Sequence, residues 1–154
     1  LWGHKLEGTE TWLGLLLVDG SRTAAVHALT ELWTGRPPGN RAPVTSPVRI
    51  AGAARVQPGE IVAASADIAD PDGDPVEVEW ALRPESGESL TGGDYRRPAR
   101  PIEGAIVEAD AGRVRVRLPE APGAYRLFVE ARDRAGNAAT ANAPLLVLGE
   151  PRAP

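Results

Sequence analysis

The strongest constraint in this sequence is a strict alternation of charged and apolar residues at positions 113–118, Arg-Val-Arg-Val-Arg-Leu. Successive side chains of a β-strand point to opposite faces, so this pattern buries Val114, Val116 and Leu118 and leaves the arginines in water. Residues 76–82 alternate in the same way. Because a helix repeats every 3.6 residues and not every two, the chain must build much of its core from half-buried strands.

Short segments of this kind recur after residue 44, separated by turns rich in Gly, Pro and Asp. We expect five strong strands, at residues 61–68, 76–82, 113–118, 125–132 and 141–148, and two weaker ones, at 48–50 and 102–108. About seven short strands over about 110 residues is typical of an immunoglobulin-like β-sandwich. Trp80 is expected in its core, and residues 122–127 resemble a tyrosine corner.

The chain changes character near residue 36. Residues 1–36 contain three of the four tryptophans and no proline, whereas the rest is Pro-rich and alternating. Between them, residues 36–43 read Arg-Pro-Pro-Gly-Asn-Arg-Ala-Pro, and prolines exclude helix and favour extended backbone. We therefore divide the chain into a first segment at 1–36, a Pro-rich linker at 37–43 and a sandwich at 44–150.

The first segment has the pattern strand, turn, helix. Residues 12–18 form a nearly continuous apolar run, as expected of a strand covered on both faces, and Asp19-Gly20 follows as a turn. Ser21 is expected to cap a helix over 22–34. The apolar stripe of that helix consists of Val26, Leu29, Leu32 and Trp33. A lone strand and helix cannot bury both faces of the strand, so this segment is predicted to be the end of an α/β structure.

Composition excludes several classes of function. The chain has no cysteine, which rules out a disulfide framework and a thiolate metal site. Its net charge of -4 argues against a nucleic-acid partner, because no basic stripe is present to neutralise phosphates. No apolar run approaches the ~20 residues that a membrane-spanning helix needs.

An acidic turn, Asp70-Pro71-Asp72-Gly73-Asp74, is the motif that points most directly to chemistry. Its carboxylates repel one another unless water or a hard cation screens them, and Ca²⁺ prefers such oxygen ligands. A second acidic turn begins at Asp133, and Asn40 enters from the same expected end of the sandwich. We predict a Ca²⁺ site formed by Asn40, Asp70, Asp72 and Asp133, with Asp74 capping the turn. The alternative, a solvated turn between two strands, stays open.

The remaining polar residues do not form a catalytic pattern. His4, Glu7 and Glu10 are interpreted as solvated loop groups, and His27 as a surface or packing histidine. The sequence contains no Ser/His/Asp order and no Gly-rich phosphate loop. We therefore expect no catalysis by this chain.

Several motifs of the sandwich segment recur in one family: Asn40-Arg41-Ala42-Pro43, Asp70-Pro71-Asp72-Gly73-Asp74-Pro75, Val78-Glu79-Trp80, Gly123-Ala124-Tyr125-Arg126-Leu127-Phe128-Val129 and Asp133-Arg134-Ala135-Gly136-Asn137. Over residues 40–149 they resemble the PKD-type (polycystic-kidney-disease-type) immunoglobulin-like domain. The resemblance implies an accessory module of a secreted hydrolase, with calcium at one pole in some members. By position it points to the same four residues: Asn40, Asp70, Asp72 and Asp133. The Pro- and Arg-rich stretch at 84–101 departs from the compact family pattern.

Four motifs carry a second resemblance: Leu1-Trp2-Gly3, Trp12-Leu13-Gly14-Leu15-Leu16-Leu17, Asp19-Gly20 and Leu32-Trp33. They make residues 1–36 similar to the C-terminal tail of retaining (β/α)8-barrel glycoside hydrolases. This resemblance implies that Trp2 is a platform beneath the sugar. The two catalytic glutamates of those enzymes lie on earlier strands, so Glu7 and Glu10 do not inherit their role.

Together the two resemblances imply a non-catalytic C-terminal fragment of a bacterial secreted glycoside hydrolase. It would act outside the cell, at the cell surface or in the periplasm, as a spacer or stabiliser with weak glycan contact. The expected partners are the upstream barrel of the same protein and a polysaccharide. Two alternatives stay open: a carbohydrate-binding module, and an adhesion or structural module unrelated to sugars. The former needs exposed aromatic side chains, for which the sandwich offers Tyr95 and Phe128.

Because residues 12–18 and the helix stripe lack partners for most of their apolar surface, the first segment is expected to be unstable alone. Limited proteolysis should cut near Arg36 and leave a fragment from about residue 40 onward intact. Mass spectrometry of the products measures the outcome. A protease-resistant full-length chain, with slow hydrogen exchange across residues 13–32, would show that the two parts fold as one unit.

Overall fold

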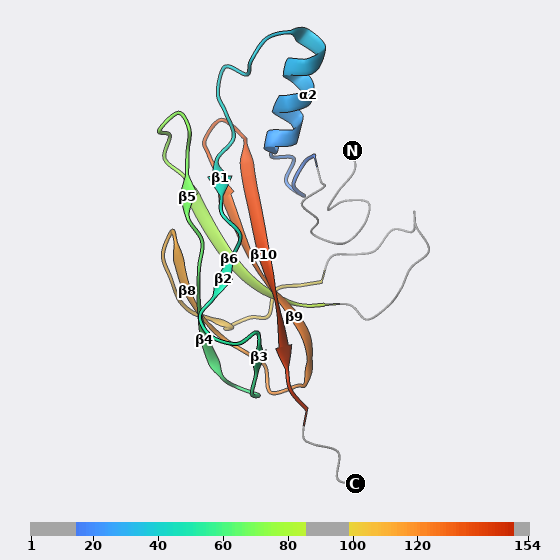
Figure 1. The fold of residues 1–154 in the computed structure, drawn as a ribbon, viewed down its shortest axis with the longest axis vertical. Coiled ribbons are helices and arrows are strands. Elements are labelled where there is room, and N and C mark those ends of the chain that lie inside the picture. The colour runs from blue at the N-terminus through green and yellow to red at the C-terminus, as the bar shows by residue number, and fades with distance from the viewer. Residues whose placement is uncertain (1–14, 86–98, 150–154) are drawn as a thin grey trace, which may run out of the picture.

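The computed structural model of the chain describes residues 15–85 and 99–149. It is mainly β, with two four-stranded sheets that share one core and a small third sheet of two strands. In Figure 1 the long strands run along the long axis of the molecule, and helix α2 (Ala24–Thr34) stands at one end. The mainly β, sandwich-like architecture expected from the alternating segments is confirmed at this level.

The first large sheet contains, in spatial order, β3 (Arg55–Val56), β10 (Ala138–Val147), β9 (Gly123–Arg132) and β6 (Glu77–Pro84). Within it, β3 and β10 are parallel, and the other neighbours are antiparallel. The second contains β2 (Arg49–Ile50), β4 (Ile61–Ser65), β8 (Arg113–Arg117) and β7 (Ile106–Ala109), all antiparallel. The small sheet pairs β1 (Val44–Thr45) with β5 (Ile68–Ala69).

Each of the seven predicted strands has a counterpart among these elements. The segment predicted as one strand at 61–68 divides into β4 and β5, because the chain leaves the second sheet after Ser65 and pairs next with β1. Sequence reasoning missed β1 and β3. Each contains two residues, too few to display an alternation.

The core lies between the two large sheets, where the alternating residues meet. From β8 and its end it takes Val114, Val116 and Leu118, and from the facing sheet Leu127 and Leu145, all at most 2% exposed. The arginines between these β8 residues are exposed. The alternation in the sequence therefore corresponds to the alternation of inward and outward side chains along the strand.

Two aromatic residues tie the core to the loops. Trp80 is buried, and its indole Nε1 donates a hydrogen bond to the backbone oxygen of Asp110 at 3.2 Å. The hydroxyl of Tyr125 donates to the backbone oxygen of Ala121, four residues upstream, at 2.8 Å. Both predictions, a core tryptophan and a tyrosine corner, are confirmed.

The first segment differs from the prediction in its described part. Residues 15–22 form a tight turn in which Leu16 and Arg22 make a single bridge. Residues 15–18, the described part of the strand predicted at 12–18, therefore do not form a continuous strand. The N-cap of α2 is Thr23, not Ser21, and it makes no side-chain capping bond. Its hydroxyl donates instead to the carbonyl of Leu15 at 3.0 Å.

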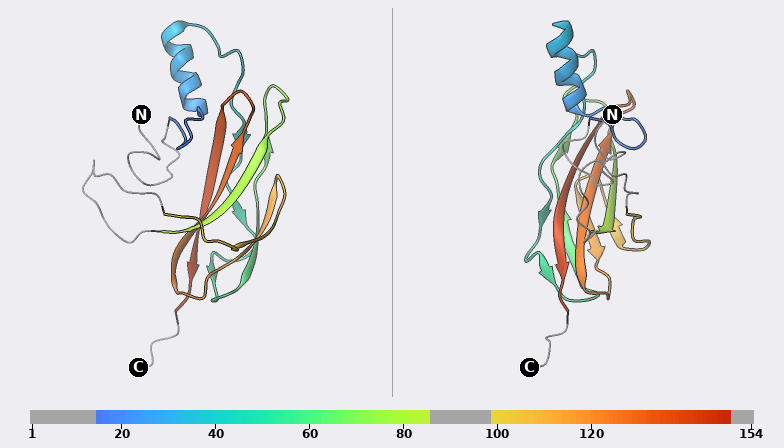
Figure 2. Two further views of the ribbon diagram at one scale, coloured as in Figure 1. Left: turned by 180° about the vertical axis from the view of Figure 1, so that it is seen from behind. Right: turned by 90° about the vertical axis from the view of Figure 1, so that its right-hand side faces the viewer.

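Helix α2 projects beyond the sandwich instead of covering a sheet. Figure 2 shows it beyond the strand ends in both views. None of its residues is buried, and Leu32 and Trp33 are 76% and 77% exposed. Gly35 ends the helix in the left-handed region, with a φ of 66°, as its position after the stripe predicted. Of the predicted stripe, Leu32 and Trp33 are exposed, whereas Val26 and Leu29 are half-buried.

Truncation of the core should be costly, and an outward position on the same sheet provides a control. Leu127→Ala removes a fully buried side chain and is expected to lower the free energy of unfolding by about 2–5 kcal/mol. Leu146→Ala acts on a side chain that is 38% exposed and should cost much less. Urea denaturation followed by circular dichroism measures both. Equal losses would contradict the placement of Leu127 in the shared core.

Candidate functional site

Three carboxylates gather at the end of the sandwich that adjoins α2. Asp70 follows β5, Asp74 lies just before β6, and Asp133 follows β9. Each offers an oxygen, and these oxygens all lie within 4.8 Å of one another. The three residues meet because the β5–β6 turn and the β9–β10 loop emerge at the same end, as Figure 1 shows.

Asp70 organises the acidic turn. One carboxylate oxygen accepts hydrogen bonds from the N–H groups of Asp72 at 2.8 Å and Asp74 at 3.2 Å, and Gly73 enables the turn with a φ of 79°. The turn-capping role predicted for Asp74 therefore belongs to Asp70. The other oxygen of Asp70, Oδ2, is buried and has no hydrogen-bond partner. It is a buried acceptor without a donor.

A buried asparagine holds the second loop. The side chain of Asn137 is fully buried, and its Nδ2 donates to Asp133 at 2.7 Å and to Asn40 at 2.6 Å. Its Oδ1 lies 2.9 Å from Nε2 of His27, which donates when that nitrogen carries the proton. Asn40 in turn donates to Asp74. The amide thus connects α2, the linker and both acidic loops.

Asp72 lies outside this cluster and binds the linker. Its carboxylate accepts hydrogen bonds from the backbone N–H of Arg41 at 2.6 Å and from the Arg41 guanidinium at 2.7 and 2.9 Å. These bonds, the backbone one first, lower the pKa of Asp72 below its ordinary value of 3.8. Of the four predicted ligands, the structure brings together Asn40, Asp70 and Asp133.

The three clustered carboxylates carry negative charge without a matching positive group. In residues 15–85 and 99–149, none of them makes an ion pair, and Asp133 is only 8% exposed. Two oxygens on opposite sides of one Ca²⁺ ion lie about 5 Å apart, since each Ca–O distance is about 2.3–2.6 Å. A set of oxygens within 4.8 Å therefore fits a single hard cation held by Asp70, Asp74 and Asp133.

The same end of the sandwich receives the first segment. The N–H of Arg22 donates to the carbonyl of Gly136 at 2.9 Å, and the N–H of Ala138 donates to the carbonyl of Arg22 at 2.8 Å. Asp19 forms an ion pair with Arg132 at 2.7 Å. Although partial burial works in the opposite direction, the N–H of Ser21 and the Arg132 guanidinium lower the pKa of Asp19. The acidic cluster therefore lies beside a joint between two parts of the chain.

Sequence reasoning missed three members of this site: Asp74, Asn137 and His27. Asn137 is the last residue of the Asp-x-x-Gly-Asn motif, and this motif is the sequence signal by which Asn137 could have been found. His27 could not be found, because only the docking of α2 brings it to the loop.

The other residues considered in the sequence analysis do not belong to this cluster. Trp2, His4, Glu7, Glu10 and Tyr95 lie outside the described residues. Phe128, an expected exposed aromatic, is buried, and the guanidinium of Arg83 lies 5.7 Å from its ring centroid. Phe128 is therefore not a free stacking surface for a sugar.

Comparison of the chain with protein-family models gives no match, and comparison with curated proteins finds no relative. The helical part of the described residues contains no segment with the length and apolar character needed to cross a membrane.

The contact between Arg41 and Asp72 predicts an acid-sensitive link between linker and turn. A carboxyl whose pKa is lowered by folding stabilises the fold above its unfolded pKa, and this contribution is lost as the pH falls through the lower folded value. An NMR titration of the Asp72 carboxyl carbon should therefore give a midpoint below 3.8. Arg41→Ala keeps the backbone N–H and removes only the guanidinium, so the midpoint should rise part of the way toward that value. An unchanged midpoint would refute the contribution of the guanidinium.

Proposed function

We propose that this chain is a non-catalytic accessory module whose acidic end binds Ca²⁺ and thereby fastens the first segment to the sandwich. One observation carries the proposal. Three carboxylates converge without an ion pair among the described residues, and one of their buried oxygens, Oδ2 of Asp70, has no hydrogen-bond partner. A bound cation would satisfy that oxygen and remove the repulsion among the three charges.

The strand order supports the immunoglobulin-like part of this proposal, and the sequence motifs of residues 40–149 are what suggest the PKD type. In immunoglobulin-like domains one sheet contains strands A, B, E and D, and the other contains C, F and G. The order β2-β4-β8-β7 corresponds to the first of these, and β10-β9-β6 corresponds to G, F and C. Trp80 on β6 and the Tyr125 corner on β9 occupy the positions that this correspondence expects.

The cation would act as a clamp between loops that are far apart in the sequence. Asp70 and Asp74 belong to the β5–β6 turn, and Asp133 belongs to the β9–β10 loop. The linker joins the same group because Asn40 bonds both Asp74 and Asn137. Fixing these loops would hold the linker in one orientation, which is what a rigid spacer requires.

The resemblance of residues 1–36 to a barrel tail supports placing this module after the catalytic barrel of a secreted glycoside hydrolase. Extracellular calcium modules typically bind with dissociation constants of about 10⁻⁴–10⁻³ M, so a site of this kind would be filled outside the cell. The barrel of the same polypeptide would be its principal partner. An adhesion or structural module would use the same clamp, and the sequence that precedes residue 1 distinguishes the two.

Calcium should raise the thermal stability of the chain. At a concentration about 100 times the dissociation constant, a ligand that binds only the folded state adds about 2.7 kcal/mol. For a chain of this size, this corresponds to a rise in Tm of about 5–10 °C. Calorimetry in excess Ca²⁺ and in chelator measures the difference, and equal midpoints would reduce the cluster to a solvated acidic turn.

Two variants make this experiment specific. Asp70→Asn keeps an oxygen that can cap the turn but removes one ligand charge, so it should abolish most of the calcium response. Asp72→Asn removes a carboxylate of the same turn that binds Arg41 instead, and its calcium response should equal that of the native chain. Loss of the response in both variants would contradict the assignment of ligands.

A further inference from the structure

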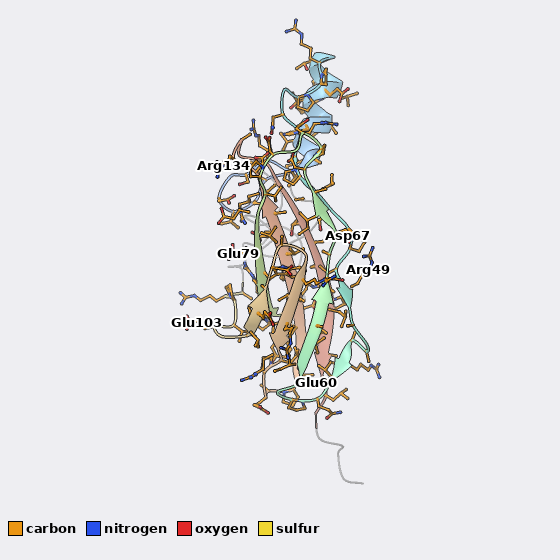
Figure 3. All side chains as sticks on the ribbon, turned by 90° about the vertical axis from the view of Figure 1, so that its left-hand side faces the viewer. Arg49, Glu60, Asp67, Glu79, Glu103 and Arg134 are labelled. Atoms are coloured by element: carbon orange, nitrogen blue, oxygen red, sulfur yellow. The ribbon has the colours of Figure 1, made fainter. Side chains whose placement is uncertain are left out.

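The outer face of the second sheet contains an open groove of about 470 Å³ at the end of β8 where Arg113 lies. Its floor is made by small residues of β4, Ala63 and Ser65, and its sides by longer charged residues of the neighbouring strands: Arg49, Glu108, Arg113 and Arg115. Figure 3 looks onto this side of the molecule and shows Arg49 beside Asp67. The groove shares no residue with the acidic cluster.

The strand register arranges the arginines around the short floor residues. Arg49 on β2 and Arg113 on β8 are both direct partners of Ser65 on β4, one on each side. Adjacent strands lie about 4.8 Å apart, so the backbones of Arg49 and Arg113 lie one strand spacing to either side of Ser65, and these long side chains can reach a single ligand above it. Arg115 is the cross-strand partner of Ala63, which adds a third cation about 7 Å along the strand from Arg113.

The arginines are available to a ligand. Arg113 makes no ion pair among the described residues. Arg49 pairs with Asp67 at 2.9 Å, and Arg115 pairs with Glu108 at 3.6 Å. Both pairs are largely exposed, and exposed pairs are weak and screened by salt. A ligand carboxylate can therefore replace either acidic partner at little cost.

We propose that this groove binds an acidic polysaccharide, one whose sugar units carry carboxylates. Arg49 and Arg113 would hold one carboxylate above Ser65 by charge-assisted hydrogen bonds, and Arg115 would hold the next. Glu108 and Asp110, which also line the groove, are acceptors for sugar hydroxyls. A groove that contains both donors for carboxylates and acceptors for hydroxyl groups suits a ligand that carries both groups.

Other polymers fit the groove less well. A nucleic acid would bring closely spaced phosphates against Glu108 and Asp110, which line the groove. Single-stranded nucleic acids and neutral sugars both rely on stacking against exposed aromatic rings, and the groove is lined by none. Ion pairing and hydrogen bonding remain as the means of recognition.

The test is isothermal titration of the full chain with a galacturonate oligosaccharide in chelator, at a temperature where circular dichroism shows a folded chain. Chelator separates this binding from the calcium site and prevents calcium bridges between acidic sugars. The carboxyl-reduced form of the same oligosaccharide and a single-stranded DNA oligonucleotide serve as matched ligands. Binding should be specific to the carboxylated sugar and should weaken with salt.

Variants connect the binding to the groove. Loss of one charge-assisted hydrogen-bonding group typically weakens binding by about tenfold, so Arg113→Ala should raise the Kd by that factor. Arg113→Lys, which keeps the charge but loses the planar fork, should fall between. Arg55→Ala removes an exposed arginine from β3 on the other sheet and should change nothing. Absence of binding, equal binding of the reduced sugar or of DNA, or equal loss in Arg55→Ala would overturn the proposal.

Discussion

The joint between the two parts of this chain depends on satisfying one buried amide. The side chain of Asn137 is fully enclosed, and a buried amide left without partners costs about 1–3 kcal/mol for each unsatisfied group. Its partners come from three separate segments: His27 on α2, Asn40 in the linker and Asp133 in its own loop. The position of α2, the course of the linker and the shape of the β9–β10 loop are therefore mutually dependent.

At the same end of the sandwich, the repulsion among Asp70, Asp74 and Asp133 acts against these hydrogen bonds. Asn137 and Asn40 hold Asp133 and Asp74 in position, while Asp70 is fixed by the N–H groups of its own turn. The hydrogen bonds thus oppose the mutual repulsion of three carboxylates. The cation that we propose at this cluster would remove the repulsion without requiring the loops to move.

The location of the site could be predicted from the sequence, but its membership could not. The two acidic turns and Asn40 follow from turn chemistry and from the alternation of strand directions. The choice between Asp72 and Asp74 depends on where Arg41 lies, because its backbone and guanidinium withdraw Asp72 from the cluster. That contact spans residues 31 apart in the sequence, and no local pattern records it. The helix contact of His27 is hidden for the same reason.

The strands were predictable because inward apolar and outward polar residues alternate in the sequence. The same alternation explains why the outer face of the sheet can carry charged residues. At β8 the inward positions are constrained by the core, where Val114 and Val116 are buried. The outward positions carry no packing requirement, so arginines there leave the core unaltered. Short side chains on β4 then leave room between the arginines of β2 and β8. Charged residues can thus be placed on the outer face of a sheet independently of the fold, and independently of the acidic cluster that lies beside the joint.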